Sequence, residues 1–311
     1  MRPVRNLCLA AIASVLIGSS ALAQLPLSNT GDLYVGSYAG NEIAVYDGDG
    51  NFLHSFTAAG LTGTRGILIH GDRIYAASQT TSEIFIFDGD ENFLSKFSAP
   101  LLSGPTGMAL SSSQELYISS FNNDSVCVFD LDGNYQRRVT TGGINGPNCV
   151  AFDSVGAFYV ASALTAMVVK YDANDNYLFS FTGGGLSSPM AIARDNSDVL
   201  YVAGGSSHNI CRFDTSGNYL GQFSHPDLTG PQGIAFDERG HLFSSSFYQH
   251  KLVEFDASLN YVQTVTAGAL QVPRSVAFAS GVTATPATGP LVIGALALAI
   301  LGLGVRTLRK R

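Results

Sequence analysis

The sequence predicts an all-β fold, a six-bladed β-propeller with four-stranded antiparallel blades, from three observations. First, a phrase made of an aromatic residue, Asp, a small polar turn and Asn occurs six times, as in "FDTSGNYLGQF" from Phe213. Second, its Asp returns at intervals of 41, 42, 42, 42 and 42 residues, and two other series keep this period. Third, each period contains four short stretches of alternating apolar and polar residues, which is the pattern of strands. Four strands in about 42 residues is the size of one propeller blade.

The three series fix the phase of the blades along the chain. The aspartates are Asp47, Asp88, Asp130, Asp172, Asp214 and Asp256; the asparagines are Asn51, Asn92, Asn134, Asn176, Asn218 and Asn260; the aromatic residues are Tyr34, Tyr75, Tyr117, Tyr159, Tyr201 and Phe243. Within a period we expect a first strand like "PQGIAF" from Pro231, a second like "LYV" from Leu200, a third like "NICRFD" from Asn209 and a fourth like "YLGQF" from Tyr219.

The recurring phrase is predicted to be the hairpin between the third and fourth strands. Its Asp can accept backbone N–H bonds inside the turn. Three copies carry Gly at a position where a left-handed conformation is expected, namely Gly50, Gly133 and Gly217. The other three carry Glu91, Asp175 and Leu259 there, so we expect those turns to be strained or differently shaped.

The two ends of the array complement each other. The first period starts at its second strand, near Asp32, and the last residues, "PRSVAF" from Pro273, supply a first strand without partners. An unpaired apolar strand would be an exposed edge, which proteins avoid. We therefore predict that blade one is closed by three strands from the N-terminal side and one from the C-terminal side, within a propeller of residues 31–280.

Units such as "TGPQGIAFDERGHLFSSSF" followed by "KLVEFDASLNYVQTV" resemble NHL repeats. The resemblance covers residues 31–280 and implies a six-bladed propeller. It does not imply one activity, because this fold serves binding modules, lactonases and lyases alike.

Residues 1–23 have the features of a secretory signal. "MRPVRN" carries positive charge, "LCLAAIASVLIG" is apolar, and "ALA" precedes Gln24, which predicts cleavage between Ala23 and Gln24. Residues 24–30 then lead into the propeller. The alternative is an uncleaved N-terminal anchor helix.

The C-terminal residues predict a membrane anchor. A polar linker at 281–290 precedes an uncharged apolar segment at 291–305 and a basic tail at 306–311. Fifteen helical residues reach only ~22 Å of a ~30 Å hydrocarbon core, but a short span is accommodated by local thinning of the bilayer. The basic tail should stay in the cytoplasm, with the propeller outside.

Linker, apolar segment and basic tail together resemble the sorting signals that exosortases and sortases process. The linker contains "TPATG", formed by Thr285, Pro286, Ala287, Thr288 and Gly289. It has Thr where the sortase motif has Leu, and it lacks the Pro-Glu-Pro of the commonest exosortase signal. The alternative is a permanent single-span anchor, which leaves the predicted location unchanged.

Charge and cysteine content exclude several classes. All 24 acidic residues lie between Asp32 and Asp256, whereas six of the 17 basic residues lie in the terminal segments. A body this acidic should repel nucleic acid. The mature chain keeps an odd number of cysteines, Cys127, Cys149 and Cys211, which argues against a full disulfide framework. Cys127 and Cys211 occupy an apolar repeat position and should pack as small hydrophobic residues.

The predicted ligand face is formed by loops before the first strand and after the second. The first-strand positions are, in ring order, Arg274, Arg65, Thr106, Asn148, Met190 and Gln232; the second-strand positions are Ser37, Ser78, Ser120, Ser162, Gly204 and Ser246. Lactonases that resemble this family bind calcium with carboxylates from this face. Because none of these positions is acidic, we predict no metal site and no cofactor.

Arg65 and Arg274 lie at equivalent positions of adjacent blades. With Tyr38, Phe121 and Phe247 beside them, they are predicted to bind an anionic or carbohydrate group, and Thr106, Asn148 and Gln232 share that rim. The alternative is a pair of solvated arginines that form ion pairs with Glu42 or Glu83. The turn aspartates should gather on the opposite face.

The sequence offers no catalytic residues. His208 and His250 share a repeat position with Asn41, Ser82, Asp124 and Ala166, which favours a structural role, and nothing in the repeat brings His225 to Glu254. We therefore expect an exported, envelope- or surface-anchored propeller that binds a protein or glycan ligand. The alternative is an extracytoplasmic hydrolase or lyase that uses the propeller mouth.

Overall fold

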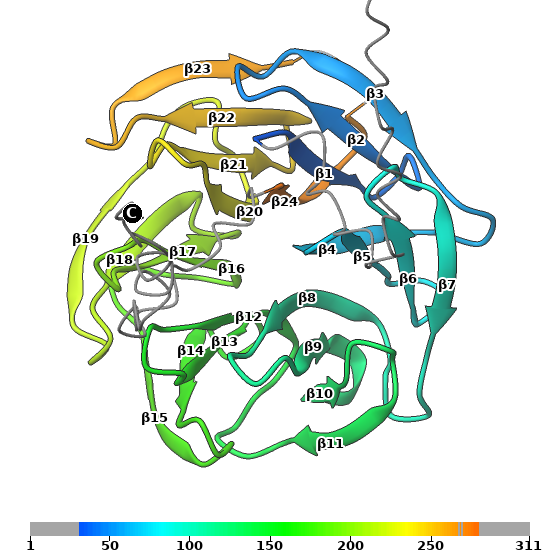
Figure 1. The fold of residues 1–311 in the computed structure, drawn as a ribbon. Coiled ribbons are helices and arrows are strands. Elements are labelled where there is room, and N and C mark those ends of the chain that lie inside the picture. The colour runs from blue at the N-terminus through cyan, green and yellow to red at the C-terminus, as the bar shows by residue number, and fades with distance from the viewer. Residues whose placement is uncertain (1–30, 267, 269, 280–311) are drawn as a thin grey trace, which may run out of the picture. The chain divides into compact units, whose positions relative to one another are not determined.

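Each period of the sequence folds into four antiparallel strands, because its alternating residues can place one side chain on each face of a sheet. The computed structural model describes residues 31–266, 268 and 270–279. These residues form 24 strands and one 3₁₀ turn, η1 (Phe121–Asn123). The strands make six four-stranded sheets, which confirms the predicted six-bladed propeller (Figure 1).

The six sheets are called blades 1 to 6, and the strands of each blade are given from the innermost to the outermost. Blade 1 has β24 (Pro273–Phe278), β1 (Leu33–Ser37), β2 (Glu42–Tyr46) and β3 (Phe52–Phe56); blade 2 has β4 (Thr64–His70), β5 (Arg73–Ser78), β6 (Glu83–Asp88) and β7 (Phe93–Phe97); blade 3 has β8 (Pro105–Leu110), β9 (Leu116–Ser120), β10 (Ser125–Phe129) and β11 (Tyr135–Val139). Blade 4 has β12 (Pro147–Phe152), β13 (Phe158–Ser162), β14 (Met167–Tyr171) and β15 (Tyr177–Phe181); blade 5 has β16 (Pro189–Arg194), β17 (Leu200–Gly204), β18 (Asn209–Phe213) and β19 (Tyr219–Phe223); blade 6 has β20 (Pro231–Phe236), β21 (Leu242–Ser246), β22 (Lys251–Phe255) and β23 (Tyr261–Val265).

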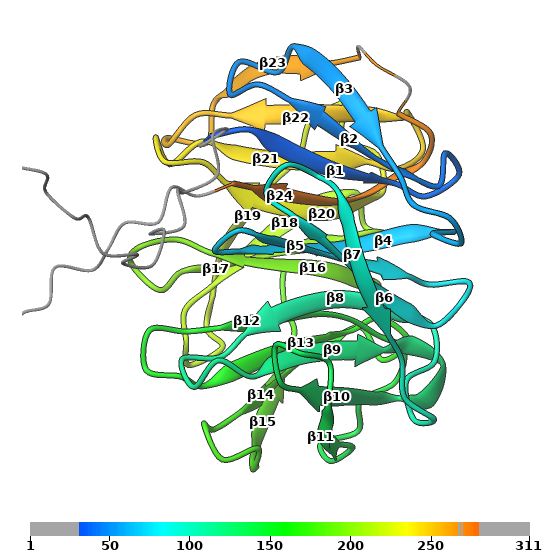
Figure 2. The ribbon, with the colours of Figure 1, turned by 45° about the vertical axis from the view of Figure 1, so that its right-hand side comes forward.

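Blade 1 is closed by both ends of the array, as predicted. Strand β24 pairs antiparallel with β1, with Leu33 opposite Phe278 and Val35 opposite Val276. The inner strands β24, β4, β8, β12, β16 and β20 each contact the next one around the ring. Figure 1 is viewed along the axis that these six inner strands surround, and Figure 2 shows the same blades turned by 45°.

The core consists of six apolar clusters, each shared by two neighbouring blades. One cluster combines Tyr34 of blade 1 with Phe85 and Phe87 of blade 2, all fully buried. Cys127 and Cys211 are also fully buried in such clusters, so their packing follows the expectation for small hydrophobic residues. The blades are thus held together mainly by apolar contact between sheet faces.

The recurring phrase forms the hairpin turn between the third and fourth strand of each blade. In blade 1, Asp47 Oδ1 accepts hydrogen bonds from the backbone N–H groups of Asp49 at 3.0 Å and Asn51 at 2.8 Å. Gly50 follows in the left-handed region at φ +85°. The side-chain amide of Asn51 donates to Asp47 Oδ2 at 2.9 Å, which explains why Asp and Asn recur together.

The turns without glycine keep the same shape. Glu91, Asp175 and Leu259 have φ values of +67°, +65° and +65°, and the backbone N–H of Glu91 donates to Asp88 O at 3.0 Å as in the glycine turns. The expectation of a different turn shape is therefore wrong. The left-handed backbone of these non-glycine residues agrees with the expected strain, and Glu91 also accepts a hydrogen bond from Tyr34 of the preceding blade at 3.3 Å.

Several predictions concern residues outside the described part of the chain. These are the signal segment 1–23 with its cleavage site at Ala23 and Gln24, the lead-in 24–30, the linker 281–290 with its sorting motif, the apolar segment 291–305 and the tail 306–311. Within the residues that the structure describes, no helix has the length and hydrophobicity needed to cross a membrane.

Candidate functional site

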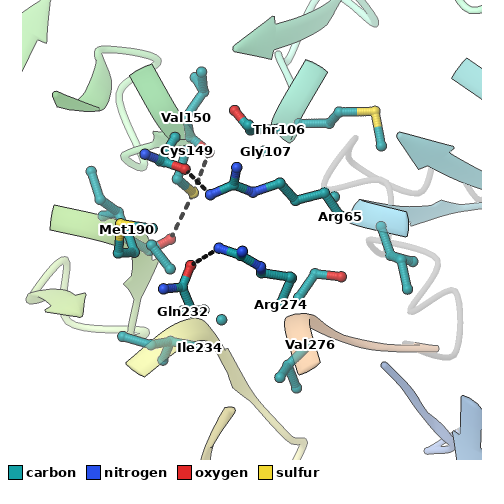
Figure 3. A pocket seen from close by; sticks show the side chains of 18 residues that line it. Arg65, Thr106, Gly107, Cys149, Val150, Met190, Gln232, Ile234, Arg274 and Val276 are labelled. Carbon is teal, nitrogen blue, oxygen red and sulfur yellow. Dashed lines mark hydrogen bonds between the residues drawn. The ribbon is translucent and has the colours of Figure 1, made fainter. Parts of the chain in front are cut away.

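The starts of the six inner strands surround a cavity of about 140 Å³ on the propeller axis. Each strand contributes its predicted first-strand residue, and these six residues all line the cavity: Arg65, Thr106, Asn148, Met190, Gln232 and Arg274. Figure 3 shows Arg65 and Arg274 reaching into this space, whereas Val150, Ile234 and Val276 point away from its centre. The apolar lining residues therefore serve the blade contacts, and the polar ones face the axis.

Close approach of the inner strands keeps the cavity narrow. A Cβ atom at Gly66 would lie 1.9 Å from the backbone oxygen of Thr106, and one at Gly233 would lie 2.8 Å from the backbone of Ser275. Glycine at these positions lets neighbouring strands touch. The cavity is thus enclosed by backbone and by the few side chains that project from the strand starts.

Arg65 extends from β4 across the cavity. Its Nη2 donates a hydrogen bond to Asn148 Oδ1 on β12, and its Cζ lies 5.9 Å from the centre of the Phe121 ring. Burial, and secondarily the charge of Arg274, lower the pKa of Arg65 from the usual range of arginine to about 9. The guanidinium therefore remains cationic at neutral pH.

Arg274 extends from β24 beside it. Its Nη1 donates to Gln232 Oε1 at 3.1 Å. Its Cζ lies 4.8 Å from the ring centre of Tyr38 and 4.3 Å from that of Phe247, so two aromatic rings hold the guanidinium by cation–π contact. Its Nε is buried and has no hydrogen-bond partner among the described residues, and burial lowers the pKa of Arg274.

Among the residues that the structure describes, no carboxylate forms an ion pair with Arg65 or Arg274. Glu83 pairs with Lys96 at 2.8 Å, and Glu42 accepts a hydrogen bond from Ser55 at 2.8 Å. The ion pairs with Glu42 or Glu83 that the alternative allowed are therefore absent among these residues. Two positive charges share a small space, and their hydrogen bonds within the described residues go to the neutral amides of Asn148 and Gln232.

The orientation of those amides makes the cavity rich in donors. A guanidinium has no acceptor, so the oxygens of Asn148 and Gln232 must face Arg65 and Arg274. Asn148 Nδ2 donates to the backbone oxygen of Gly146 at 3.4 Å, so the donors that remain for a ligand are the other guanidinium N–H groups and the amide nitrogen of Gln232. Thr106 also lines the cavity, and its hydroxyl donates to the backbone oxygen of Pro147 at 2.9 Å. The arrangement suits a group that accepts hydrogen bonds and carries negative charge.

The ring of serines after the second strands has a structural role. Ser37, Ser78, Ser120, Ser162 and Ser246 are all fully buried. In blade 2, Ser78 Oγ accepts from the backbone N–H of Thr62 at 3.0 Å and donates to the backbone oxygen of Thr62 at 2.8 Å. In blade 5, where Gly204 replaces the serine, Ser207 Oγ accepts from the backbone N–H of Ser187 at 3.1 Å. These hydroxyls fix the loops that lead into the inner strands and do not offer a ligand face.

None of the chain's six histidines lines the axial cavity. Nδ1 of His208 accepts from the backbone N–H of Gly230 at 2.8 Å, and Nδ1 of His250 accepts from that of Val272 at 2.9 Å. His225 stacks on Tyr261 with ring centres 4.0 Å apart. These contacts agree with a structural role for His208 and His250.

The shared repeat position of these two histidines joins neighbouring blades. All six of its residues adopt the left-handed conformation, namely Asn41, Ser82, Asp124, Ala166, His208 and His250. Five of them accept a hydrogen bond from the backbone N–H 22 residues further along the chain, in the loop of the next blade. The varied residue types hid this contact in the sequence, although each except Ala166 carries an acceptor.

Two further titratable features bear on chemistry. Cys149 lines the cavity, which the sequence did not indicate, but burial raises the pKa of its thiol to about 11. A thiol in that state is a poor nucleophile at neutral pH.

Glu254 accepts a hydrogen bond from His241 Nδ1 at 2.7 Å at the seam of blades 6 and 1 and does not meet His225. In the described part of the chain, no group of His, Cys, Asp and Glu side chains could hold a metal ion.

Comparisons with known proteins support the fold alone. No family model and no curated protein matches the sequence. Among solved structures, virginiamycin B lyase from Staphylococcus aureus is 15% identical with a TM-score of 0.64, over 82% of this chain and 90% of that one. The nidogen/laminin complex contains a chain that is 13% identical with a TM-score of 0.67, over 79% and 97%. A protein of unknown function from Bacteroides caccae is 15% identical with a TM-score of 0.66, over 79% and 98%.

Proposed function

We propose that this chain is an NHL-type propeller that acts as a binding module and takes an anionic group of its ligand at the mouth of the axial cavity. One observation carries the proposal: Arg65 and Arg274 project into the same cavity without a carboxylate partner among the described residues. Arg65 and Arg274 would bind the anion. Asn148 and Gln232 would position the two guanidinium groups through their side-chain oxygens, Thr106 would line the cavity, and the rings of Tyr38, Phe121 and Phe247 would hold the guanidinium groups in place.

The energetics favour an occupant of negative charge. Two like charges in a partly desolvated cavity repel each other, and removal from water costs each of them free energy. The lowered pKa of Arg65 records both effects. An anion between the guanidinium groups would offset that cost and would form charge-assisted hydrogen bonds, which are about twice as strong as neutral ones.

The ligand belongs to a protein or glycan partner outside the cytoplasm. This part of the proposal depends on the signal-like residues 1–23 and on the anchor-like residues 291–311 of the sequence. A sorting enzyme that acts at Thr285–Gly289, or a permanent anchor, would both keep the propeller at the envelope. Mass spectrometry of the mature protein tests this directly: a chain that starts at Met1 would contradict cleavage at Ala23, and an end at Arg311 would contradict sorting.

A screen of glycans and small anions against the full-length chain in non-ionic detergent tests the binding role. We expect the double variant Arg65→Ala/Arg274→Ala to lose affinity for its ligand at least about tenfold, since each charged hydrogen bond contributes about 1.5–3 kcal/mol. Arg138→Ala is the matched control, because Arg138 is exposed on β11 and lies outside the cavity. Equal binding by the wild type and the double variant would refute the proposal.

A hydrolase or lyase that acts at the same mouth is the second candidate. Its support is the similarity in fold to virginiamycin B lyase, which does not carry over an activity at this identity. The cavity lining offers Arg65, Arg274 and the high-pKa thiol of Cys149 as its titratable groups, none of which suits general acid–base catalysis at neutral pH. Turnover of lactones or uronate polymers that is lost in Arg65→Ala would make this candidate the better one.

A further inference from the structure

We infer that the anion taken by the axial cavity is a compact, doubly charged tetrahedral oxyanion, either sulfate or a phosphate group. The inference rests on the proposed function, because it names the chemical class of ligand for the same pair of arginines. Three features of the cavity lead to it: the number of uncompensated charges, the directions of the donors, and the volume.

The charge count favours a dianion. Arg65 and Arg274 each bond to a neutral amide, Asn148 and Gln232 respectively. The cavity lining contains no acidic residue. A monoanion such as a carboxylate would leave one net positive charge in a narrow, backbone-walled space, whereas a dianion would compensate both.

The donor directions favour a tetrahedral group. The two guanidinium groups start from neighbouring strands, β4 and β24, and reach toward different partners on β12 and β20 (Figure 3). A group between them therefore meets donors from more than one direction. The two oxygens of a carboxylate lie in one plane and match a single guanidinium fork, whereas sulfate and phosphate present oxygens in several directions.

The volume limits the size of the group. A cavity of about 140 Å³ is close to the ~150 Å³ of an engineered cavity that binds benzene. A sulfate or phosphate group is smaller than benzene and fits this volume, whereas a larger ligand would have to leave the rest of its body outside the strand starts. The same site could thus hold a free ion or the terminal phosphate of a monoester.

Isothermal titration calorimetry of the full-length chain at fixed ionic strength tests the inference. The probes are sodium sulfate, methyl sulfate, sodium acetate and glucose 6-phosphate. Sulfate should bind at least about tenfold more tightly than either monoanion. Methyl sulfate has the tetrahedral geometry of sulfate but a single negative charge, and acetate is planar and also carries a single negative charge. Glucose 6-phosphate should bind more tightly as the pH rises from 5 to 7, because its second pKa is about 6, whereas sulfate affinity should stay constant.

Variants separate this inference from the proposed function. Arg65→Gln should weaken sulfate binding about tenfold or more, and Arg65→Lys, which keeps the charge and loses the planar fork, should weaken it less. Arg138→Gln should change nothing. Far-UV circular dichroism identifies a variant that fails to fold, and Arg65→Lys then still tests the site.

The outcomes are distinguishable. If acetate binds as tightly as sulfate and both need Arg65, the inference is wrong and the anion-binding function stands. If no probe binding depends on Arg65 or Arg274, both are wrong. If sulfate binds and glucose 6-phosphate does not, the inference holds and the ligand is the free ion; if both bind, the group can be borne on a larger molecule.

Discussion

At the scale of single residues, blades 1 and 5 supply the same buried hydroxyl from different positions. Blade 1 has Ser37 followed by Gly40, whereas blade 5 has Gly204 followed by Ser207. A Cβ atom at Gly40 would lie 2.5 Å from Ser37 Oγ, and one at Gly204 would lie 2.1 Å from Ser207 Oγ. The two positions therefore share one contact, and in blades 2 and 4 both carry hydroxyls that bond to each other, Thr81 Oγ1 to Ser78 Oγ at 2.7 Å and Thr165 Oγ1 to Ser162 Oγ at 2.6 Å.

This shared contact predicts strong coupling between residues 204 and 207. Ser207→Gly alone should cost about 1–3 kcal/mol because it leaves the backbone N–H of Ser187 without a partner, and Gly204→Ser alone should cost less because Ser207 can turn toward the new hydroxyl as Thr81 does toward Ser78. The double variant reproduces the Ser37 and Gly40 arrangement of blade 1 and should recover most of the lost stability. Urea denaturation of the four proteins measures the coupling, and purely additive losses would contradict it.

The lowered pKa of Arg65 predicts the pH dependence of binding. Below about pH 9 the guanidinium is charged in the folded protein, so sulfate affinity should be constant from pH 7 to 8.5. As the pH rises through about 9, Arg65 loses its proton and the affinity should fall. Calorimetry from pH 7 to 10.5 checks this, and a flat profile up to pH 10.5 would show that Arg65 keeps its proton and that its pKa is not lowered into this range.

The free energy of unfolding should gain a favourable contribution from Arg65 over the same pH range in which sulfate affinity falls. The folded-state pKa of Arg65 lies well below the usual range of arginine, so folding disfavours the charged form. The resulting cost is fully present below about pH 9 and decreases as the pH rises above it. A site that lowers the stability of the empty protein at neutral pH is consistent with a role in ligand binding.

At the scale of elements, the hairpin turns also act as contacts between blades. Gly133, in the turn between β10 and β11, has φ +87°, and a Cβ atom there would lie 2.4 Å from the ring of Phe97 on β7 of the preceding blade. Gly143 has a similar φ of +72° but has open space around it. These two glycines separate backbone strain from packing between blades.

Alanine at these two positions should therefore have different costs. Gly143→Ala should destabilise the protein by about 1–2 kcal/mol, which is the cost of a left-handed backbone for an L residue. Gly133→Ala should cost clearly more, because the ring of Phe97 must also move. Thermal unfolding of both variants measures the difference. Equal losses would mean that the turn of blade 3 does not press on blade 2.

The sequence was sufficient to predict those elements in which a local pattern determines the structure. The period of Asp47 and its equivalents gave the blade boundaries, and the starts of the inner strands gave Arg65 and Arg274 as neighbours around the axis. The hydrogen bonds of the Ser78 series and of the His208 series were not foreseen. Their partners are backbone groups in loops 16 to 22 residues away, so no residue type marks them in the sequence.

At the scale of the whole molecule, ring closure depends on one strand. Strand β24 completes blade 1 by pairing with β1, supplies Arg274 to the cavity and contacts the inner strands of blades 6 and 2. Its apolar residue Val276 is buried in the cluster between blades 6 and 1. The seam is tied further by Arg239 Nη2, which donates to the backbone oxygen of Gly48 at 2.9 Å, and by Gln263 Nε2, which donates to that of Asp49 at 2.9 Å.

Truncation of the chain tests whether this strand closes the ring. A chain that ends at Gly281 keeps β24 and should have the unfolding transition of the full-length protein, because the described propeller ends before that residue. A chain that ends at Val272 loses β24, so blade 1 keeps three strands and the edge of β1 is left unpaired. It should unfold at a lower temperature, lose cooperativity and associate through the open edge, as seen by calorimetry and light scattering. A cooperative, monomeric product that ends at Val272 and melts like the Gly281 product would mean that the other five blades hold the ring without β24.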